Sequence, residues 1–318
     1  MDANRKSMQM RVAKDLVTAL SLPRPAVVSI IGSGGKTTLM YRLAKELVQQ
    51  NKKVITTTTT KIYPPMRTQS PYIYLCDKRG IEPLRKQGQP LLKKLDKYQQ
   101  ITLAAGKNNE NKLVGLDPEI VDNLADNLLK NGKLDYILVE ADGAKGKSLK
   151  GYRIENPKSD LTTLKLHQVK IRNLSTEALA KVDPQTAIVE PVIPKSSKLC
   201  VLVLGWDILE KPLNERYVHR AKILSKLIHA KMNTKISIST LIDALCLPEG
   251  YISRVPSKCK LIIFINKVNY ISAKKRFMQF CQGLIRFSPR PIDRIIIGTL
   301  QDSNIYFTQR PQSRRKVR

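Results

Sequence analysis

The sequence predicts an α/β fold in which a doubly wound, mainly parallel sheet lies between two layers of helices. Apolar runs of strand length recur along the chain, and helix-like segments separate most of them. Continuous apolar runs of this kind are typical of strands that helices cover on both faces. Each run ends in polar or glycine residues. Because ligands bind beyond the carboxyl ends of the strands in such sheets, functional residues are expected at those ends.

The first expected strand is "AVVSII" (26–31), and the segment that follows it has apolar residues at helical spacing. A second helix is predicted over 117–132, where Asp117 is the N-cap, Pro118 stands in the first turn and Gly132 ends the helix. The other expected elements are a proline-marked helix at 82–95 and strands at "KKVITT" (52–57), "YIYLC" (72–76), "QITLAA" (100–105), "LDYILVEADG" (134–143), "KLCVLVLGWD" (198–207), "KLIIFINKVN" (260–269) and "RIIIGTL" (294–300).

Composition limits the class of protein. A chain of 318 residues that is 42% hydrophobic can bury a sizeable core. The longest apolar runs are of strand length and the N-terminal segment has no secretory apolar region, so we expect no membrane span and a cytoplasmic protein. Five widely separated cysteines argue against a disulfide framework. The excess of 56 Lys and Arg over 26 Asp and Glu, a net charge of +30, favours anionic partners such as nucleotides or nucleic acid.

Between the first strand and its helix lies "IIGSGGKTT" (30–38), which predicts a phosphate-binding loop, or P-loop. The usual spacing, G-x-x-x-x-G-K-[ST], requires glycine where Ile30 stands, so the loop is a compact variant. Its glycines permit positive φ angles and allow backbone amides to turn toward a phosphate. We expect Lys36 to bridge the β- and γ-phosphates and Thr37 to ligate Mg²⁺. The residues expected to bind the nucleotide here are Gly32, Ser33, Gly34, Gly35, Lys36, Thr37 and Thr38.

The predicted fold is therefore P-loop NTPase-like, with three layers in the order α/β/α. A single P-loop domain is expected over 26–305, with an N-terminal extension at 1–25 and a basic tail at 306–318. Between 151 and 190 the apolar pattern breaks, and only "STEALAKV" (175–182) is amphipathic. We interpret 151–190 as an irregular insertion that crosses the functional face.

Two acids follow the apolar run "YILV" (136–139), namely Glu140 and Asp142. An acid in this position is placed near the Mg²⁺ of P-loop enzymes. We expect Glu140 to hold the metal and Asp142 to orient an attacking water. Lys36, Glu140 and Asp142 are thus the predicted catalytic residues.

A row of threonines, "TTTTTKI" (56–62), follows the second expected strand. β-Branched threonines suit a strand end on propensity alone, so some of them are expected to be structural. Thr58 is predicted to complete the Mg²⁺ shell, and Lys61 is predicted to add positive charge near the nucleotide phosphates.

The segment "FINKVN" (264–269) has N-K-x-N where the guanine-binding motif of GTPases has N-K-x-D. The amide of Asn269 has only one acceptor oxygen, which weakens the expected selectivity for guanine. Asn266 and Lys267 are predicted to line the base pocket. ATP and GTP both remain open as the nucleotide.

Several motifs together resemble the YqeC family of selenium-dependent hydroxylase accessory proteins. They are "GSGGKTTLMYRLAKEL", "VITTTTTKI", "VEADGAKGKSLK", "EPVIP", "VLGWDILEKPLNERYVHR", "RVPSK" and "INK". The resemblance implies a P-loop nucleotide-binding fold and a role in the maturation of selenium-dependent molybdenum hydroxylases. It also implies such a hydroxylase, or a selenium-handling protein, as a partner. This chain differs from the family pattern in its "NKVN" and in the roughly forty residues that precede "EPVIP".

The leading functional hypothesis is a Mg²⁺-dependent accessory protein that binds and hydrolyses ATP or GTP. One alternative is a small-molecule kinase or ATP-dependent ligase that uses the same P-loop, with 151–190 covering an acceptor. A second alternative is a nucleic-acid-associated nucleotide switch that uses the basic surface. The RNA-binding aromatic motifs that would favour nucleic acid are absent from the sequence.

Overall fold

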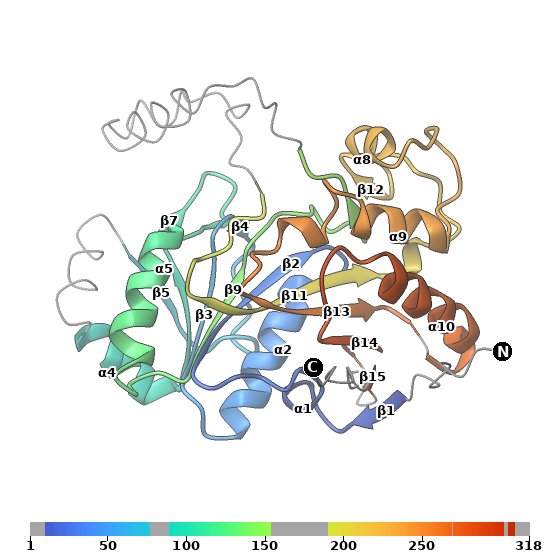
Figure 1. The fold of residues 1–318 in the computed structure, drawn as a ribbon. Helices are drawn as coiled ribbons and strands as arrows, with labels where there is room; N and C mark the ends of the chain where they lie inside the picture. Colours follow the sequence, from blue (N-terminus) through green and yellow to red (C-terminus); the bar gives the residue numbers. More distant parts are fainter. Residues whose placement is uncertain (1–9, 77–88, 154–189, 269, 302–304, 309–318) are drawn as a thin grey trace, which may run out of the picture.

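The computed structural model describes residues 10–76, 89–153, 190–268, 270–301 and 305–308. Within them a ten-stranded sheet crosses the molecule, as Figure 1 shows. In spatial order its strands are β1 (Met10–Ala13), β15 (Ile305–Thr308), β14 (Arg294–Gly298), β13 (Lys260–Asn266), β11 (Ser197–Gly205), β2 (Ala26–Gly32), β9 (Tyr136–Glu140), β3 (Val54–Thr58), β6 (Gln100–Ala104) and β5 (Ile73–Leu75).

The sheet is mainly parallel, which confirms the predicted fold class. All neighbouring strands from β14 to β5 run parallel, and only β15 pairs antiparallel with both β14 and β1. β1 comes from the segment predicted as an N-terminal extension, and most of β15 comes from the predicted C-terminal tail. These two short strands therefore complete one edge of the main sheet.

Two apolar layers lie on opposite faces of the sheet, and β2 contributes to both. Val27 and Ile31 belong to one buried cluster, whereas Val28 and Ile30 belong to the other. This alternation follows from the period of two in a strand. Helices α1 (Leu16–Leu20) and α2 (Lys36–Gln49) supply the second cluster. The first cluster is supplied by α4 (Gln89–Tyr98), α5 (Pro118–Leu124), α9 (Ile238–Cys246) and α10 (Tyr270–Phe287).

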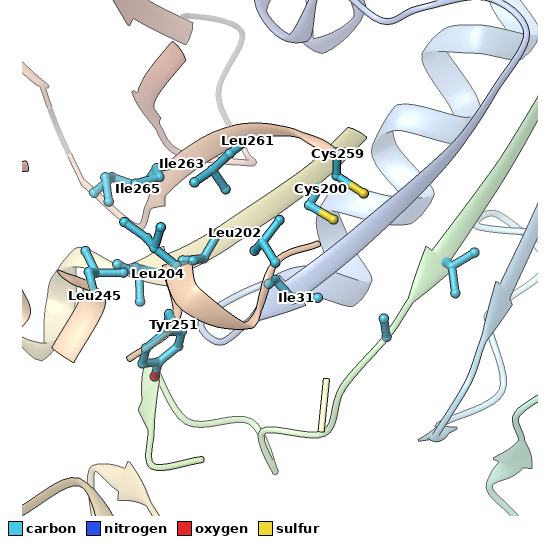
Figure 2. Close-up of a cluster of buried hydrophobic side chains, with 14 of the residues drawn as sticks. Ile31, Cys200, Leu202, Leu204, Leu245, Tyr251, Cys259, Leu261, Ile263 and Ile265 are labelled. Atoms are coloured by element: carbon cyan, nitrogen blue, oxygen red, sulfur yellow. The ribbon is translucent and has the colours of Figure 1, made fainter. Parts of the chain in front are cut away.

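Figure 2 shows part of the first cluster, where side chains of β11 and β13 pack against Ile31 and Tyr251. Leu202 and Leu204 of β11 and their neighbours on β13 are all buried. Helices thus cover both faces of the sheet, so the three-layer α/β/α arrangement predicted from the continuous apolar runs is confirmed.

The helix predicted over 117–132 is present and begins as expected. The Asp117 side chain accepts from the Glu119 amide, and Pro118 occupies the first turn of α5. After α5 the helix widens into a π-helical turn, η1 (Ala125–Leu129). Of the helix predicted at 82–95 the described part is α4. Most of the predicted insertion, 154–189, lies outside the described residues.

Two small sheets lie at the carboxyl edge of the main sheet. One pairs β10 (Leu149–Lys150) with β12 (Val218–His219), next to α8 (Ala221–Leu227). The other consists of β4 (Lys61–Ile62), β8 (Leu113–Val114) and β7 (Gly106–Lys107). No helix in the described part of the chain is long and apolar enough to cross a membrane.

The order of the strands reverses at β2. The chain runs from β2 toward β3 and β6, returns to β9 at one side of β2, and then crosses to β11 at the other side. The carboxyl ends of β9, β2, β11 and β13 consequently meet at one place. Ligands bind at such a switch point in open α/β sheets. Of the predicted catalytic residues, Glu140 is the last residue of β9, Asp142 follows it, and Lys36 follows β2.

Candidate functional site

The connection between β2 and α2 is a tight loop that only glycine can form. Gly32, Gly34 and Gly35 have φ angles of +92°, +85° and +131°. A Cβ on Gly34 would lie 2.4 Å from the Gly205 backbone nitrogen, and one on Gly35 would lie 2.3 Å from Nδ2 of Asn266. The ends of β11 and β13 therefore lie against the loop, and they exclude a side chain at Gly34 and Gly35.

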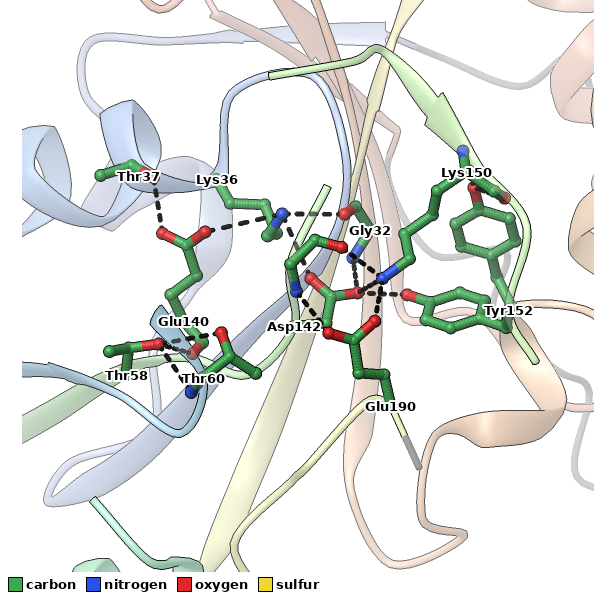
Figure 3. Close-up of polar contacts among 12 residues, drawn as sticks. Gly32, Lys36, Thr37, Thr58, Thr60, Glu140, Asp142, Lys150, Tyr152 and Glu190 are labelled. Atoms are coloured by element: carbon green, nitrogen blue, oxygen red, sulfur yellow. Dashed lines mark hydrogen bonds and ion pairs between the residues drawn. The ribbon is translucent and has the colours of Figure 1, made fainter. Parts of the chain in front are cut away.

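Lys36, the first residue of α2, lies buried above the loop with only 4% of its surface exposed. Its ammonium group donates to the Gly32 carbonyl oxygen at 2.9 Å and lies 3.2 Å from Oδ1 of Asp142. It also lies 3.6 Å from Oε1 of Glu140 (Figure 3). Burial alone would lower the pKa of Lys36, but the carboxylates of Asp142 and Glu140 outweigh it, and the pKa is raised. Lys36 is therefore charged.

Thr37 and Glu140 form the second element of the site. The Thr37 hydroxyl donates to Oε2 of Glu140 at 2.6 Å. Burial raises the pKa of Glu140, and the nearby Lys36 ammonium and the Thr37 hydroxyl oppose this shift. Two oxygen atoms, one from β9 and one from α2, thus lie together at the start of a helix.

This donor set fits Mg²⁺, which prefers oxygen ligands and keeps several waters or phosphate oxygens in its shell. Among the described residues, no group of three or more His, Cys, Asp or Glu side chains could hold a metal ion. A cation held by Thr37 and Glu140 would therefore need waters or phosphate oxygens to complete its coordination.

Asp142 is completely buried beneath the loop. Its Oδ2 accepts from the Gly32 amide at 2.9 Å and from the Tyr152 hydroxyl, and it lies 3.6 Å from the ammonium group of Lys150. Burial, followed by the negative charge of Asp142, raises the pKa of Tyr152 well above its usual value, so the phenol keeps its proton and donates it. These contacts fix Asp142 in place, and its role in orienting water stays a prediction.

Three further charged residues extend the ion pairs outward from Asp142, and no role for them was predicted from the sequence. They are Lys150 of β10, Glu190 and Arg220. Lys150 has no exposed side-chain surface and donates to Glu190 at 2.7 Å, while Arg220 donates to the same Glu190 oxygen at 3.1 Å. All three stand in motifs that carry the family resemblance, namely "VEADGAKGKSLK", "EPVIP" and "VLGWDILEKPLNERYVHR".

Three other predicted site residues, Thr58, Lys61 and Ser33, make contacts or lie in positions that do not by themselves indicate a ligand-binding role. The Thr58 hydroxyl donates to the Glu140 carbonyl oxygen at 2.7 Å and accepts from the Thr60 amide at 3.0 Å. Lys61 is exposed on the small three-stranded sheet. Ser33 is completely buried and its amide donates to the Val203 carbonyl oxygen. Roles for Thr58 in metal binding and for Lys61 in phosphate binding stay predictions.

A pocket of about 410 Å³ opens beside the loop, where a nucleotide base is expected. Asn266 holds the pocket together, because its Nδ2 donates to the Gly34 carbonyl oxygen at 2.7 Å and its Oδ1 accepts from the Leu300 amide at 3.1 Å. Lys267 donates to Ser148 at 2.9 Å and to Asp207 at 3.1 Å. The residues that line the pocket are Gly35, Thr38, Asn266, Lys267, Val268, Thr299, Leu300 and Gln301.

The predicted base residues Asn266 and Lys267 are thus both at this pocket. Asn266 uses its amide to brace the loop, which is a role that the motif did not indicate. Asn269, on which the expectation about guanine rests, lies outside the described residues.

Comparison with solved structures finds matches that cover most of this chain, but with low TM-scores and low sequence identity. The MinC:MinD cell division protein complex of Aquifex aeolicus matches with a TM-score of 0.36 and 13% identity, over 86% of this chain and 81% of that chain. FtsY from Mycoplasma mycoides matches with a TM-score of 0.34 and 14% identity, over 89% of this chain and 64% of that chain. The backbones therefore agree only in coarse outline.

Comparison of sequences is more specific. The uncharacterized protein YqeC of Escherichia coli (strain K12) is 27% identical over 279 residues, which are 88% of this chain and 89% of that protein. The sequence profile of the YqeC protein family matches residues 28–178 and 185–222, which include the loop, both acids of the β9 end and Arg220. The match covers more than half of the chain and confirms the resemblance seen in the motifs, so this protein belongs to the YqeC family.

Proposed function

We propose that this protein binds a Mg²⁺–nucleoside triphosphate at the loop 32–38 and hydrolyses it. The observation that carries the proposal is the buried Lys36 at the start of α2, beside the paired oxygens of Thr37 and Glu140. A charged lysine is held there by two carboxylates and a carbonyl oxygen, close to the free amides of a helix N-terminus. Phosphate oxygens are the group that this arrangement is suited to receive.

In the proposed complex Lys36 turns from Asp142 and Glu140 to the β- and γ-phosphates, and the amides at the start of α2 contact the phosphate oxygens. Thr37 and Glu140 hold the metal ion. When bound, Mg²⁺ supplies positive charge that offsets the negative charge on the reacting phosphate oxygens. Asn266 keeps the loop and the base pocket together, and we propose Asp142 as the group that orients the attacking water.

We infer the biological role from the family. Membership of the YqeC family supports an accessory role in the maturation of selenium-dependent molybdenum hydroxylases, with such an enzyme or a selenium-handling protein as the partner. Hydrolysis is distinguished from phosphoryl transfer by the rate of ADP release. A constant slow rate supports hydrolysis, whereas a rise that depends on an added acceptor supports a kinase or ligase.

The site is tested with Lys36→Ala, using calorimetric titration with Mg·ATP and Mg·GTP. The variant should lose nucleotide affinity by about a hundredfold, which is about 2.7 kcal/mol. The reason is that alanine provides no positive charge to bind the phosphate oxygens that Lys36 would contact. Lys45→Ala is the matched control, since Lys45 is exposed on the same helix. Unchanged affinity in Lys36→Ala would show that the phosphates bind elsewhere.

Removal of Lys36 also leaves two buried carboxylates without their shared cation, so the fold of the variant is checked by thermal unfolding. A second measurement avoids the variant altogether. Wild-type protein should bind the triphosphate at least a hundredfold more tightly than the matching nucleoside, since the phosphates supply most of the contacts. Equal affinity for both would contradict the proposed site.

A further inference from the structure

The charges around the loop form a balanced series of ion pairs. Three carboxylates alternate with three cations, and every side chain in the set is at least three-quarters buried. We call this set the buried charge cluster. Its members are Lys36, Glu140, Asp142, Lys150, Glu190 and Arg220.

Asp142 is the member that two cations share. The ammonium group of Lys36 approaches Oδ1 at 3.2 Å, and that of Lys150 approaches Oδ2 at 3.6 Å. Lys36 comes from the loop side and Lys150 from the side of the small β10–β12 sheet (Figure 3). The carboxylate therefore keeps one cation if the other moves away.

Several contacts hold both the side chain and the backbone of Lys150 in place. Its ammonium group donates to the Gly143 carbonyl oxygen at 2.5 Å and to Oε2 of Glu190 at 2.7 Å. Its backbone amide donates to the Tyr251 hydroxyl at 2.7 Å, and that hydroxyl donates back to its carbonyl oxygen at 2.6 Å. The ring of Tyr152 lies 4.4 Å from the ammonium group.

Glu190 is held as firmly as the lysine that it binds. Its Oε1 accepts from the Gly143 amide at 3.1 Å, and Arg220 donates to its Oε2 at 3.1 Å. The two shortest contacts of the Lys150 ammonium group, at 2.5 and 2.7 Å, are closer than any of those of Lys36, which lie at 2.9, 3.2 and 3.6 Å. We therefore take Lys150 as the fixed cation and Lys36 as the one that turns to a ligand.

We propose that Lys150 is a positioning residue that neutralises Asp142 when Lys36 turns to the nucleotide phosphates. This inference rests on the proposed function. A buried carboxylate that loses its only cation is strongly unfavourable, so without Lys150 the carboxylate would retain Lys36. Nucleotide binding would then have to break that ion pair. Lys150 thus makes the phosphate-binding lysine available, although it is not itself required to touch the nucleotide.

The test compares Lys150→Met with the double variant Asp142→Asn/Lys150→Met, using a non-hydrolysable Mg·ATP analogue and calorimetric titration. Lys150→Met should bind about tenfold more weakly than wild type, because Asp142 retains Lys36. The double variant should regain most of that affinity, since the neutral amide no longer retains Lys36 and can still accept from the Gly32 amide. Thermal unfolding of each variant establishes that it is folded.

Lys147→Met is the matched control. Lys147 lies in the same segment and its ammonium group donates to the Arg216 carbonyl oxygen at 2.6 Å, so it also braces the connection to β12. The affinity of Lys147→Met for the Mg·ATP analogue should equal that of wild type. A loss in Lys147→Met equal to that in Lys150→Met would show that general bracing of the segment is the cause.

The outcomes separate the two proposals. If wild-type protein binds no Mg·nucleotide, the proposed function is wrong. If wild type binds and Lys150→Met binds equally well, Lys150 has no part in freeing Lys36. If the folded Lys150→Met loses affinity and Asp142→Asn restores none of it, Lys150 acts on packing and the charge argument is overturned. Weakening in the single variant with recovery in the double variant supports the inference.

Discussion

His219 should make the protein less stable in mild acid. It lies half-buried in β12, opposite Lys150 of β10 in the small parallel sheet. Burial is the main cause that lowers the pKa of His219 from 6.5 to about 4, and the positive charges of Arg220 and Lys150 add to it. The native imidazole is therefore neutral at pH values where that of the unfolded chain is already protonated.

The sign follows from proton linkage. Between pH 6.5 and 4 the unfolded state binds more protons at this residue than the native state does, so the free energy of unfolding falls as the pH falls. For these two pKa values, the loss between about pH 7.5 and pH 5 is ~2 kcal/mol. Because His219 is partly exposed, solvent screens the neighbouring charges, and we reduce the expected loss to ~1 kcal/mol.

The assay is urea unfolding of wild type, His219→Gln and His229→Asn at three pH values from 7.5 to 5. Glutamine does not titrate, so the acid-induced loss in His219→Gln should be smaller than in wild type by ~1 kcal/mol. His229 is exposed, and its variant should keep the full loss. Identical pH dependence in wild type and His219→Gln would refute the conclusion that β12 holds a neutral imidazole.

Two further predictions concern the loop and the metal. Gly34→Ala should abolish Mg·ATP binding in calorimetry and lower the melting temperature, because its Cβ would meet the Gly205 backbone at 2.4 Å at a φ of +85°. Gly106→Ala, where nothing lies within 4 Å of the added Cβ, should behave as wild type. Thr37→Val should lose the increase in ATP affinity that Mg²⁺ produces, while the affinity in EDTA stays within about threefold of wild type. Retention of the Mg²⁺ effect would remove Thr37 from the metal site.

Local patterns were sufficient to predict the parallel strands of the sheet and to select the residues that lie at the centre of the candidate site. Continuous apolar runs indicated the parallel strands, and the polar residues after them indicated Lys36, Thr37 and Glu140, which the structure brings together. They lie together because the carboxyl ends of the parallel strands meet at one edge of the sheet. Edge strand β1 was not predicted, because four residues without regular alternation carry little signal apart from their partner β15.

The outer half of the buried charge cluster could not be derived in this way. Lys150 and Glu190 are forty residues apart in the chain, and their pairing depends on the tertiary fold. A lysine and an acid in polar segments are normally solvent-exposed, so nothing local marks Lys150 as completely buried. The same limit applies to Asn266, whose motif indicated base contact but whose amide joins the Gly34 carbonyl oxygen to the Leu300 amide.

The register of β2 explains why the loop lacks the first glycine of the usual P-loop. Ile30 is completely buried and pairs with Glu140 of β9, so position 30 is still part of the strand. A longer loop would begin there and remove one core residue and one rung of the ladder. The short loop instead begins at Gly32, whose amide is held by Asp142 while the following amide donates to β11. Neighbouring strand ends thus supply the support that the missing residues would give, and this places Asp142 and its neutralising cations beneath the proposed phosphate site.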